Sequence, residues 1–525
     1  MKAIFSSKRS RLLFQLFIAV ISIIRTTNCW GKEYCIQKQD SITATSVDSF
    51  IAKNQVNQKY SAAIKEFYAS NQHEYVWIQN NQINQHAKDF IIHANKLAPN
   101  SIDSSFVGQL TKQNFSQNNA ASDIDLSLSL AFFTYAEKWL MPSDIDPTLV
   151  KWRIPKISLP LVNQLKNWLN PATITGFNTG SQNFKQLLEN FVSLSSIAAL
   201  DTGINIPTSN IKINKGETAS VIKQIKKKLK LLGDYKSTDT TSLYSGLLDD
   251  AIHRFQERMG LPKTNYIDKI VLQAIRTPIQ KYANTIAINL ERLRWMPAMM
   301  DSNYIVVNIP AFQLIVFDSS KIQFKMPVIV GSASKNTIIF SDRMRYIVFS
   351  PYWNVPPSIV RAEILPGIRN NSNYLASKNM EITTHGDLPT IRQLPGTSNS
   401  LGLVKFLFPN PYNIYLHDTP SKSLFAKDVR AFSHGCIRVG SPFDLAYFLL
   451  ARQSDNPKGL FATYLNTGVE SVLTLDQPVP VHLVYFTAWP DEQGHMGYRR
   501  DIYARDKKLF AALMEAGVAV AGINS

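Results

Sequence analysis

The residues best suited to chemistry are a cysteine and a histidine in the C-terminal half of the chain. Cys436 lies in the run Ser-His-Gly-Cys-Ile-Arg-Val at 433–439, and His417 precedes it by 19 positions. The apolar residues 414–416 predict a buried strand that delivers the histidine. An imidazole within hydrogen-bond reach would accept the thiol proton and raise the population of thiolate, which is only a few per cent for a free cysteine at pH 7. The pair therefore predicts a cysteine nucleophile with a histidine base.

Such a pair is typical of acyl transfer from an amide. The thiolate would attack the carbonyl carbon, and the backbone N–H groups near Gly435 and Cys436 would hold the oxyanion. His417 would then protonate the leaving amine, which leaves a thioester on the protein. An amine acceptor would resolve the thioester into a new amide, whereas water would only hydrolyse it.

Two other interpretations of this cysteine remain open. His417, His434 and Cys436 could be three ligands of a zinc ion, although no fourth ligand is obvious nearby and zinc would occupy the thiolate that catalysis needs. Cys436 could also be an inert buried thiol. If the two other cysteines, Cys29 and Cys35, pair in an oxidising compartment, Cys436 is the lone free thiol. The acyl-transfer interpretation requires no metal and no other cofactor.

The chain has 525 residues, a length that predicts two to four domains, and one of them must position Cys436 and His417. Residues 40–205 are rich in Asn, Gln and Ser with helical spacing, which predicts a helical scaffold without chemistry of its own. Residues 210–280 carry two apolar helical faces that end at Gly233 and Gly260, and Asp268 is placed to begin a third helix. This pattern predicts a compact three-helix module.

The catalytic pair lies in a segment with a different pattern. From residue 302 to 460, short β-rich runs alternate with turn residues and predict a mostly β sandwich or partly closed barrel. Residues 365–401 contain Pro and Gly without a sustained period, which predicts a long loop, either a lid over the substrate or a passive excursion. Residues 461–525 are expected to add a strand and a closing helix to the same domain.

The N-terminus predicts export. Basic residues precede the apolar run 12–24, which is too short for a comfortable membrane span, so residues 1–28 are typical of a signal peptide. An uncleaved inner-membrane anchor remains open because the expected cleavage site is poor, and Cys29 leaves open a lipoprotein. The formal charge of +17 suits an envelope polymer, a membrane face or nucleic acid, and the export signal argues against nucleic acid. We expect a periplasmic or other cell-envelope location.

Two segments resemble known cell-wall families. The module at 210–280 resembles the small peptidoglycan-binding domain of cell-wall enzymes, although a purely structural helical module remains open. His417 with the run 433–438 resembles the active-site signature of the L,D-transpeptidases, which have a YkuD-type catalytic domain. The residues that carry the first resemblance are Gly216, Val221, Leu229, Leu232, Gly233, Ala251, Ile252, Phe255, Gln256, Gly260 and Leu261.

Three further runs resemble the long, scaffold-bearing branch of the L,D-transpeptidases: Ile-Val-Val-Asn-Ile-Pro at 305–310, Pro-Tyr-Trp-Asn-Val-Pro-Pro-Ser at 351–358 and Gly-Leu-Val-Lys-Phe at 402–406. This likeness runs from about residue 45 to 510. One departure is Thr337-Ile338, where relatives commonly have Thr-Pro. The resemblance implies a multi-domain α+β fold with a helical scaffold, a peptidoglycan-binding module and a mostly β catalytic domain.

The resemblance also implies a substrate and residue roles. The donor is the tetrapeptide stem of peptidoglycan, cut before its terminal D-Ala and joined to an acceptor stem as a 3→3 cross-link, and carbapenems would acylate Cys436. The backbone carbonyl of Asp418 would orient His417. The remaining pocket candidates, each with a structural role as its alternative, are Ser433, His434, Arg438, Tyr352 and Trp353.

Three other functions remain open for the same sequence. The acyl-enzyme could serve an L,D-carboxypeptidase, or it could attach a protein to the wall. A non-catalytic wall-binding scaffold with a silent thiol is the alternative from another class. The nature of the product, not the sequence, separates these functions.

Overall fold

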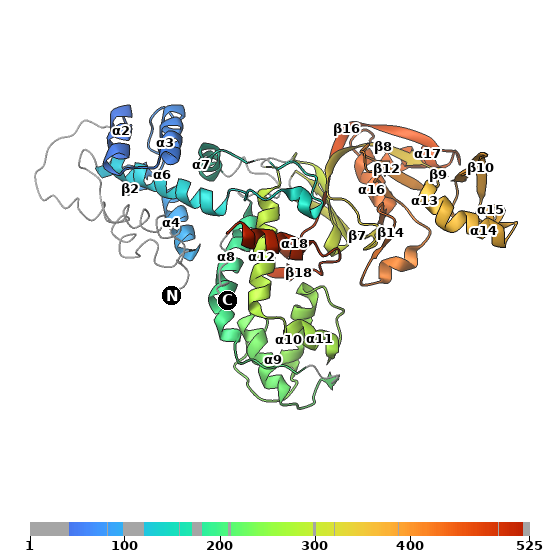
Figure 1. Ribbon diagram of the computed structural model, residues 1–525, viewed down its shortest axis with the longest axis horizontal. Coiled ribbons are helices and arrows are strands. Elements are labelled where there is room, and N and C mark those ends of the chain that lie inside the picture. The colour runs from blue at the N-terminus through green and yellow to red at the C-terminus, as the bar shows by residue number, and fades with distance from the viewer. Residues whose placement is uncertain are drawn as a thin grey trace, which may run out of the picture.

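The computed structural model describes residues 41–80, 82–97, 120–156, 158–170, 181–207, 212–297, 301–319, 321–386, 388–491 and 493–517. Figure 1 shows three parts: N-terminal helices on the left, a small helical module below and a β-rich domain on the right. The multi-domain α+β class predicted from the sequence is therefore confirmed. The expected signal segment, with Cys29 and Cys35, lies outside the described residues. Within the described ranges, none of the helices is long and apolar enough to cross a membrane.

The N-terminal part is a bundle of capped helices around an aromatic core. Three of its helices begin with an N-cap residue whose side chain accepts a hydrogen bond from a backbone N–H of the first turn. These residues are Thr43, Asn57 and Ser181. In the core, the buried Asp125 accepts from Trp77 N at 2.8 Å, so its carboxylate has hydrogen-bond donors inside the apolar interior. The helices of this part are α2 (Ala44–Lys53), α3 (Gln58–Ser70), α4 (Gln85–Leu97), α6 (Ala120–Trp139), α7 (Leu161–Leu169) and α8 (Gln182–Ile197).

The three-helix module is present as expected and has its own apolar core. Gly233 and Gly260 follow its first two helices at φ +84° and +63°, backbone conformations that glycine adopts at low cost. Asp268 caps the third helix by accepting from Val271 N at 2.9 Å. The elements are β3 (Ile213–Asn214), α9 (Val221–Leu231), α10 (Gly246–Arg258), β4 (Tyr266–Ile267) and α11 (Lys269–Ile275).

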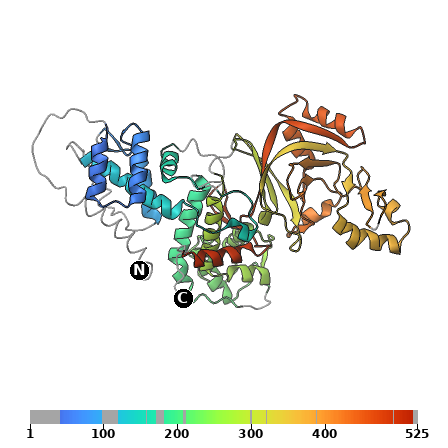
Figure 2. The same ribbon diagram turned by 45° about the horizontal axis from the view of Figure 1, so that its top comes forward.

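The β-rich domain is built on one sheet of nine strands within the described residues, in the order β14-β7-β15-β13-β12-β8-β16-β5-β6. Strand β7 also pairs with β6, so the sheet curls back on itself into a barrel. The bounds are β5 (Tyr304–Asn308), β6 (Gln313–Asp318), β7 (Lys321–Gly331), β8 (Ser341–Phe349), β12 (Val404–Leu407), β13 (Leu416–His417), β14 (Ala431–Ser433), β15 (Ile437–Val439) and β16 (Ser471–Val484). Helices α16 (Pro442–Leu450) and α17 (Pro457–Leu465) cover this barrel in Figure 2.

The segment 365–401, expected to be a long loop, is instead part of a small folded subdomain that begins at Trp353. This subdomain has a three-stranded sheet and a separate cluster of buried side chains that includes Val360, Ile364 and Ile391. Its strands are two to five residues long, and its helical stretch 357–370 has a π-helical middle followed by Pro366, so no regular period runs through it. They are β9 (Trp353–Asn354), α13 (Pro357–Ile359), η6 (Val360–Ile364), α14 (Leu365–Asn370), α15 (Tyr374–Ser377), β10 (Met380–Thr384) and β11 (Thr390–Gln393), at the right of Figure 1.

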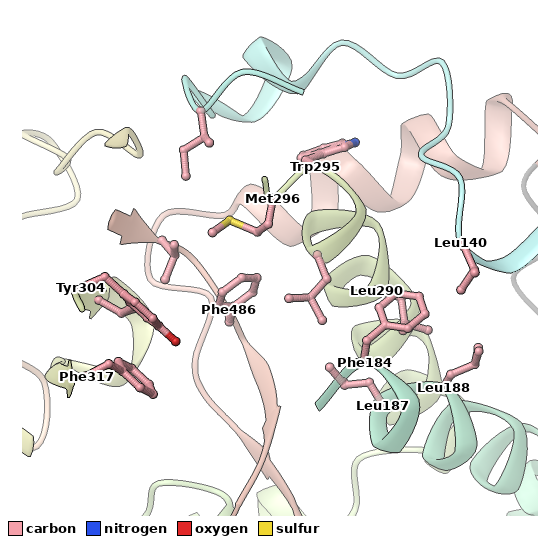
Figure 3. Packing of buried hydrophobic residues seen from close by; sticks show 14 of the residues in the cluster. Leu140, Phe184, Leu187, Leu188, Leu290, Trp295, Met296, Tyr304, Phe317 and Phe486 are labelled. Carbon is pink, nitrogen blue, oxygen red and sulfur yellow. The ribbon is translucent and has the colours of Figure 1, made fainter. Parts of the chain in front are cut away.

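Helix α12 (Ile279–Arg294) joins the helical part to the β domain. Figure 3 shows Leu290 near Phe184, Leu187 and Leu188 of α8, with Phe486 on the side of the β domain. The last helix, α18 (Arg505–Glu515), packs against α12 and the short helix η2 (Pro147–Val150), and its first residue, Arg505, also donates to Thr337 O in the β domain. A buried ion pair of 2.7 Å joins Arg292 of α12 to Asp506 of α18. That this helix completes the catalytic domain stays a prediction.

Candidate active site

Two adjacent parallel strands position the histidine and the cysteine: His417 ends β13, and Cys436 lies in the bend directly before β15. In β13 and β15, Leu416 lies opposite Ile437, and His417 lies opposite Arg438. Leu416 and Ile437 are fully buried in the apolar core, so the side chains of their neighbours in each strand project from the other face. Arg438 and His417 therefore share one face of the sheet. Tyr415 hydrogen-bonds the Cys436 thiol, and its ring centre lies 5.7 Å from that of His417, so the thiol and the imidazole are both next to this ring. His417 and Cys436 are 19 positions apart in the sequence, but the pairing of β13 with β15 brings them close together.

The imidazole of His417 is held in one orientation by the chain next to it. Its Nδ1 donates to the backbone carbonyl of Asp418 at 2.5 Å, which leaves Nε2 as the proton acceptor. Burial, and then the positive charge of Arg438, lower the pKa of His417 to about 3. At neutral pH the ring is therefore uncharged and can serve as a base.

The carboxylate of Asp418 has other partners. It accepts from Leu403 N at 2.9 Å and forms an ion pair of 2.5 Å with Lys422. Gly402 passes so close that a Cβ there would collide with this carboxylate. The side chain thus joins two loops of the barrel, and only the backbone of Asp418 faces the imidazole.

The Cys436 thiol does not meet His417 in the way we expected from the sequence. Its Sγ lies 3.5 Å from the backbone carbonyl of Asn413, to which it donates, and no hydrogen bond joins it to the imidazole among the described residues. Both groups nevertheless lie next to the Tyr415 ring.

Two charges and one phenol act on the thiol. Burial raises the pKa of Cys436, while hydrogen bonds from Tyr415 and the positive charges of Lys405 and Arg438 oppose that rise. The Lys405 ammonium lies 5.4 Å from the centre of the Tyr415 ring, and Lys405 is the strand partner of His417. The resting thiol is therefore protonated at neutral pH, beside cations that favour its anion.

Lys405 and Tyr415 were not predicted as site residues from the sequence. Both were visible only as members of strands, since nothing in their spacing relates them to a thiol 21 or more positions away. The alternation of apolar and polar residues could have pointed to them. Lys405 and Tyr415 each lie between two apolar residues, so their side chains project from the strand on the face away from the core.

The turn before the nucleophile is closed by Ser433. Its buried hydroxyl donates to Cys436 O at 2.5 Å and accepts from Gly435 N at 3.1 Å. The N–H of Gly435 is therefore bonded to Ser433, and its role as an oxyanion donor stays a prediction. We expect the N–H of Cys436 to supply the donor. Ser433 holds the turn from inside.

The other pocket candidates divide into two groups. Arg438 is close to the thiol, and its Nε is buried without a hydrogen-bond partner among the described residues. His434 faces outward, with Nε2 3.4 Å from a carboxylate oxygen of Glu363 in the folded insertion. Trp353 pairs with a strand of that insertion and, partly buried, packs against its apolar cluster, and a pocket role for it stays a prediction.

Tyr352 also lies in the insertion's own contacts. Its ring is 4.3 Å from the guanidinium of Arg392, and its backbone N–H donates to Glu470 at 2.8 Å. These contacts fix the start of the insertion to the barrel. They do not bring Tyr352 to the sulfur.

In the described ranges, no three side chains of His, Cys, Asp or Glu come together as metal ligands. A cavity of about 480 Å³ lies beside Asp418, next to the start of α16. Neither Cys436 nor His417 lines this cavity. The site thus offers a thiol, a neutral imidazole, one N–H donor and two cations, a set suited to acyl transfer.

Three family descriptions match parts of this chain. Residues 302–456 match the L,D-transpeptidase catalytic domain, residues 62–190 a scaffold domain and residues 218–275 a "Putative peptidoglycan binding domain". A curated Haemophilus influenzae protein described as "Putative L,D-transpeptidase" is 32% identical over 276 residues, which are 48% of this chain and 55% of that protein. The match thus spans about half the length of that relative.

Solved structures give weaker similarity. An L,D-transpeptidase of Stackebrandtia nassauensis shares 15% identity, covering 52% of this chain and 94% of that chain, with a TM-score of 0.22. An LD transpeptidase in complex with imipenem shares 16% identity over 35% of this chain and 59% of that chain, with a TM-score of 0.19. Both TM-scores are too low to support an argument from the superposed structures.

Proposed function

We propose that this protein, whose residues 302–456 are an L,D-transpeptidase catalytic domain, is an exported enzyme that cross-links peptidoglycan through an acyl-enzyme at Cys436. One observation carries the assignment of residues. The thiol and a buried, uncharged imidazole are both next to Tyr415, and the backbone carbonyl of Asp418 holds the imidazole. A base in this state is ready to accept the thiol proton.

The first half of the reaction forms the acyl-enzyme. Nε2 of His417 takes the proton from Sγ, and the sulfur bonds to the carbonyl carbon of the donor amide. Cys436 N–H donates to the oxygen that becomes negative. The C–N bond then breaks, and the imidazolium returns its proton to the departing amine, the terminal D-Ala of the donor stem. A thioester and a free amino acid result.

The second half uses an amine of another stem. His417 takes a proton from that amine as its nitrogen bonds to the thioester carbon, the C–S bond breaks and the thiol is reprotonated. With the side-chain amine of a diamino acid as acceptor, the product is the 3→3 cross-link. No electron transfer occurs, and no metal or cofactor takes part in these steps.

The positive charges at the site support an anionic donor. Arg438 offers a buried Nε–H without a partner among the described residues, and the Lys405 ammonium lies on the same face. A stem peptide ends in a carboxylate, which a guanidinium can bind through two hydrogen bonds. These two side chains would orient the end of the donor next to Sγ.

The folded insertion is suited to act as a lid, because it contacts the residue two positions before the nucleophile. Glu363 faces His434, and the insertion joins the barrel through the short connections on either side of its sheet. The peptidoglycan-binding module would hold the polymer while stems enter beneath this insertion. Peptidoglycan strands are thus the proposed partner of the whole chain, and the cell envelope is its proposed location.

The experiment incubates the purified protein with disaccharide-tetrapeptides and resolves the products by mass. Dimers of a tetrapeptide and a tripeptide stem, with release of D-Ala, are expected. Shortened monomers alone would indicate a carboxypeptidase instead. If the folded, reduced protein leaves the substrate unchanged, the catalytic function is wrong and a wall-binding scaffold is the remaining function.

A further inference from the structure

The loop after β7 touches the nucleophile turn, the scaffold and the C-terminal segment at once. We call residues 332–340 the bracing loop. Within it, Thr337 is fully buried, and its Oγ1 donates to Gly435 O at 2.8 Å and accepts from Gly331 N at 2.9 Å. A single hydroxyl thus connects the end of a barrel strand to the residue before Cys436.

The carbonyl that Thr337 binds belongs to the same peptide unit as Cys436 N–H. A trans peptide is planar, and its C=O and N–H point in opposite directions, so fixing the oxygen also fixes the N–H. Gly435 has φ +124°, and a Cβ there would meet only Asn336 O at 4.0 Å. A glycine tolerates many backbone conformations and does not by itself fix this peptide unit. Ser433 binds the groups on either side of the unit, Gly435 N and Cys436 O, and the Thr337 hydroxyl binds the oxygen of the unit itself.

The C-terminal segment holds Thr337 from the other side. The Tyr503 hydroxyl donates to Gly331 O at 2.6 Å and accepts from Thr337 N at 3.3 Å. The buried guanidinium of Arg505 donates from Nη2 to Thr337 O at 3.1 Å. Both backbone groups of Thr337 therefore depend on residues more than 160 positions away in the sequence.

The helical part holds the same loop. Trp152 forms a parallel bridge with Ile339, and Arg153 N donates to Ile339 O at 2.9 Å. Asp506, next to Arg505, pairs with Arg292 of α12 at 2.7 Å. The scaffold and α18 thus reach the nucleophile turn through the bracing loop, although neither contributes a side chain to the site.

We propose that Thr337 is a positioning residue for acyl transfer, which directs Cys436 N–H at the oxyanion while Tyr503 and Arg505 hold Thr337 in place. The inference rests on the proposed function, because it needs an oxyanion to form at Cys436. It also gives the C-terminal segment and the scaffold a role in catalysis. That role is to keep one peptide unit from rotating.

Two reactions of the same thiol separate positioning from simple reactivity. With imipenem, Sγ bonds to the lactam carbonyl carbon, the lactam C–N bond breaks and the ring nitrogen takes a proton, so an oxyanion forms on the way. With iodoacetamide, Sγ displaces iodide from a CH₂ carbon, and no oxyanion forms. A lost oxyanion donor slows only the first reaction.

The test measures both rates on the full chain by intact mass for wild type, Thr337→Val, Thr337→Ser and Tyr503→Phe. Thr337→Val should slow acylation by about tenfold or more, given that a missing oxyanion donor costs roughly 10²–10³ in rate, and should change alkylation less than about twofold. Thr337→Ser should restore acylation, and Tyr503→Phe should show a smaller loss. The matched control is Thr463→Val, which removes an equivalent hydroxyl bond of 3.0 Å to Gly459 O in α17.

The outcomes separate the inference from the proposed function. If wild type is not acylated although it is alkylated, the proposed function fails. If wild type is acylated and Thr337→Val is acylated equally fast, the positioning role is wrong. A parallel loss of alkylation and of thermal stability in Thr337→Val, without rescue by Thr337→Ser, would also overturn it, because the hydroxyl would then serve folding alone.

Discussion

The sulfur of Cys436 lies 3.5 Å from the backbone carbonyl of Asn413, while the imidazole of His417 on the neighbouring strand is bound on its far side to Asp418. The nucleophile and base are therefore adjacent but not joined at rest. Both are uncharged at neutral pH, since burial raises the pKa of the thiol and lowers the pKa of the imidazole. The proposed reaction therefore needs the thiol proton to leave during the catalytic cycle.

The first prediction concerns the pH dependence of thiol reactivity. Iodoacetamide reacts with the thiolate, and the pKa of Cys436 is raised by burial, so the fraction of thiolate is small at pH 7 and grows as the pH rises. The alkylation rate should climb through about pH 9 without a plateau below it. A plateau reached near about pH 6, typical of a stable thiolate–imidazolium pair, would contradict a neutral resting pair.

Lys405→Met should make the thiolate less stable. The Lys405 ammonium lowers the pKa of Cys436, so its removal should raise that pKa further and slow alkylation at about pH 7.5 by roughly threefold or more. Lys405→Arg should stay close to wild type. Lys458→Met is the matched control, because Lys458 also lies over a ring, 5.7 Å from Tyr447 in another helix of the domain. An equal loss in both Met variants would point to a general change in surface charge.

Arg438→Gln should weaken donor binding more than it slows the chemical step. If the guanidinium binds the carboxylate of the stem, its loss should raise KM for the tetrapeptide by about tenfold or more. Arg345→Gln, on an exposed position of β8, is the control for a lost positive charge. Steady-state release of D-Ala measures both constants. An unchanged KM with a large fall in kcat would show that Arg438 acts on the thiol and does not bind the substrate.

The lid role predicts protection of the insertion by substrate. Amide hydrogen exchange in α14 and α15 should slow when saturating tetrapeptide is added to Cys436→Ala, which binds the donor without turnover. Helix α6 of the scaffold is the internal control and should not change. Equal exchange in α14 and α15 with and without peptide would show that the insertion is passive.

The fold class and the strand that carries His417 could be predicted from the sequence for identifiable reasons. Helical faces and caps such as Asp268 act locally, so a single segment reveals them. The strand at 414–416 also carries its own signal, an apolar run directly before His417. These features depend only on residues that are close together in the sequence.

The insertion and the bracing contacts could not be predicted in that way. The strands of the insertion are too short for a period, its helical stretch 357–370 is interrupted by a π-helical turn, and its buried cluster joins residues from Val355 to Ile391. The contacts of Thr337 with Tyr503 and Arg505 depend on how distant segments fold together. The use of Gly435 N–H by Ser433 is a detail of one turn, which a Ser-His-Gly-Cys run does not specify.

The most direct test of Cys436 as the nucleophile is to trap the acyl-enzyme. Protein incubated briefly with disaccharide-tetrapeptide is quenched in acid, digested and examined by mass spectrometry. We predict a thioester of the shortened stem on the peptide that contains Cys436, and none in Cys436→Ala. Cross-linked dimers formed by Cys436→Ala at the wild-type rate, or an adduct on a different residue, would contradict this assignment.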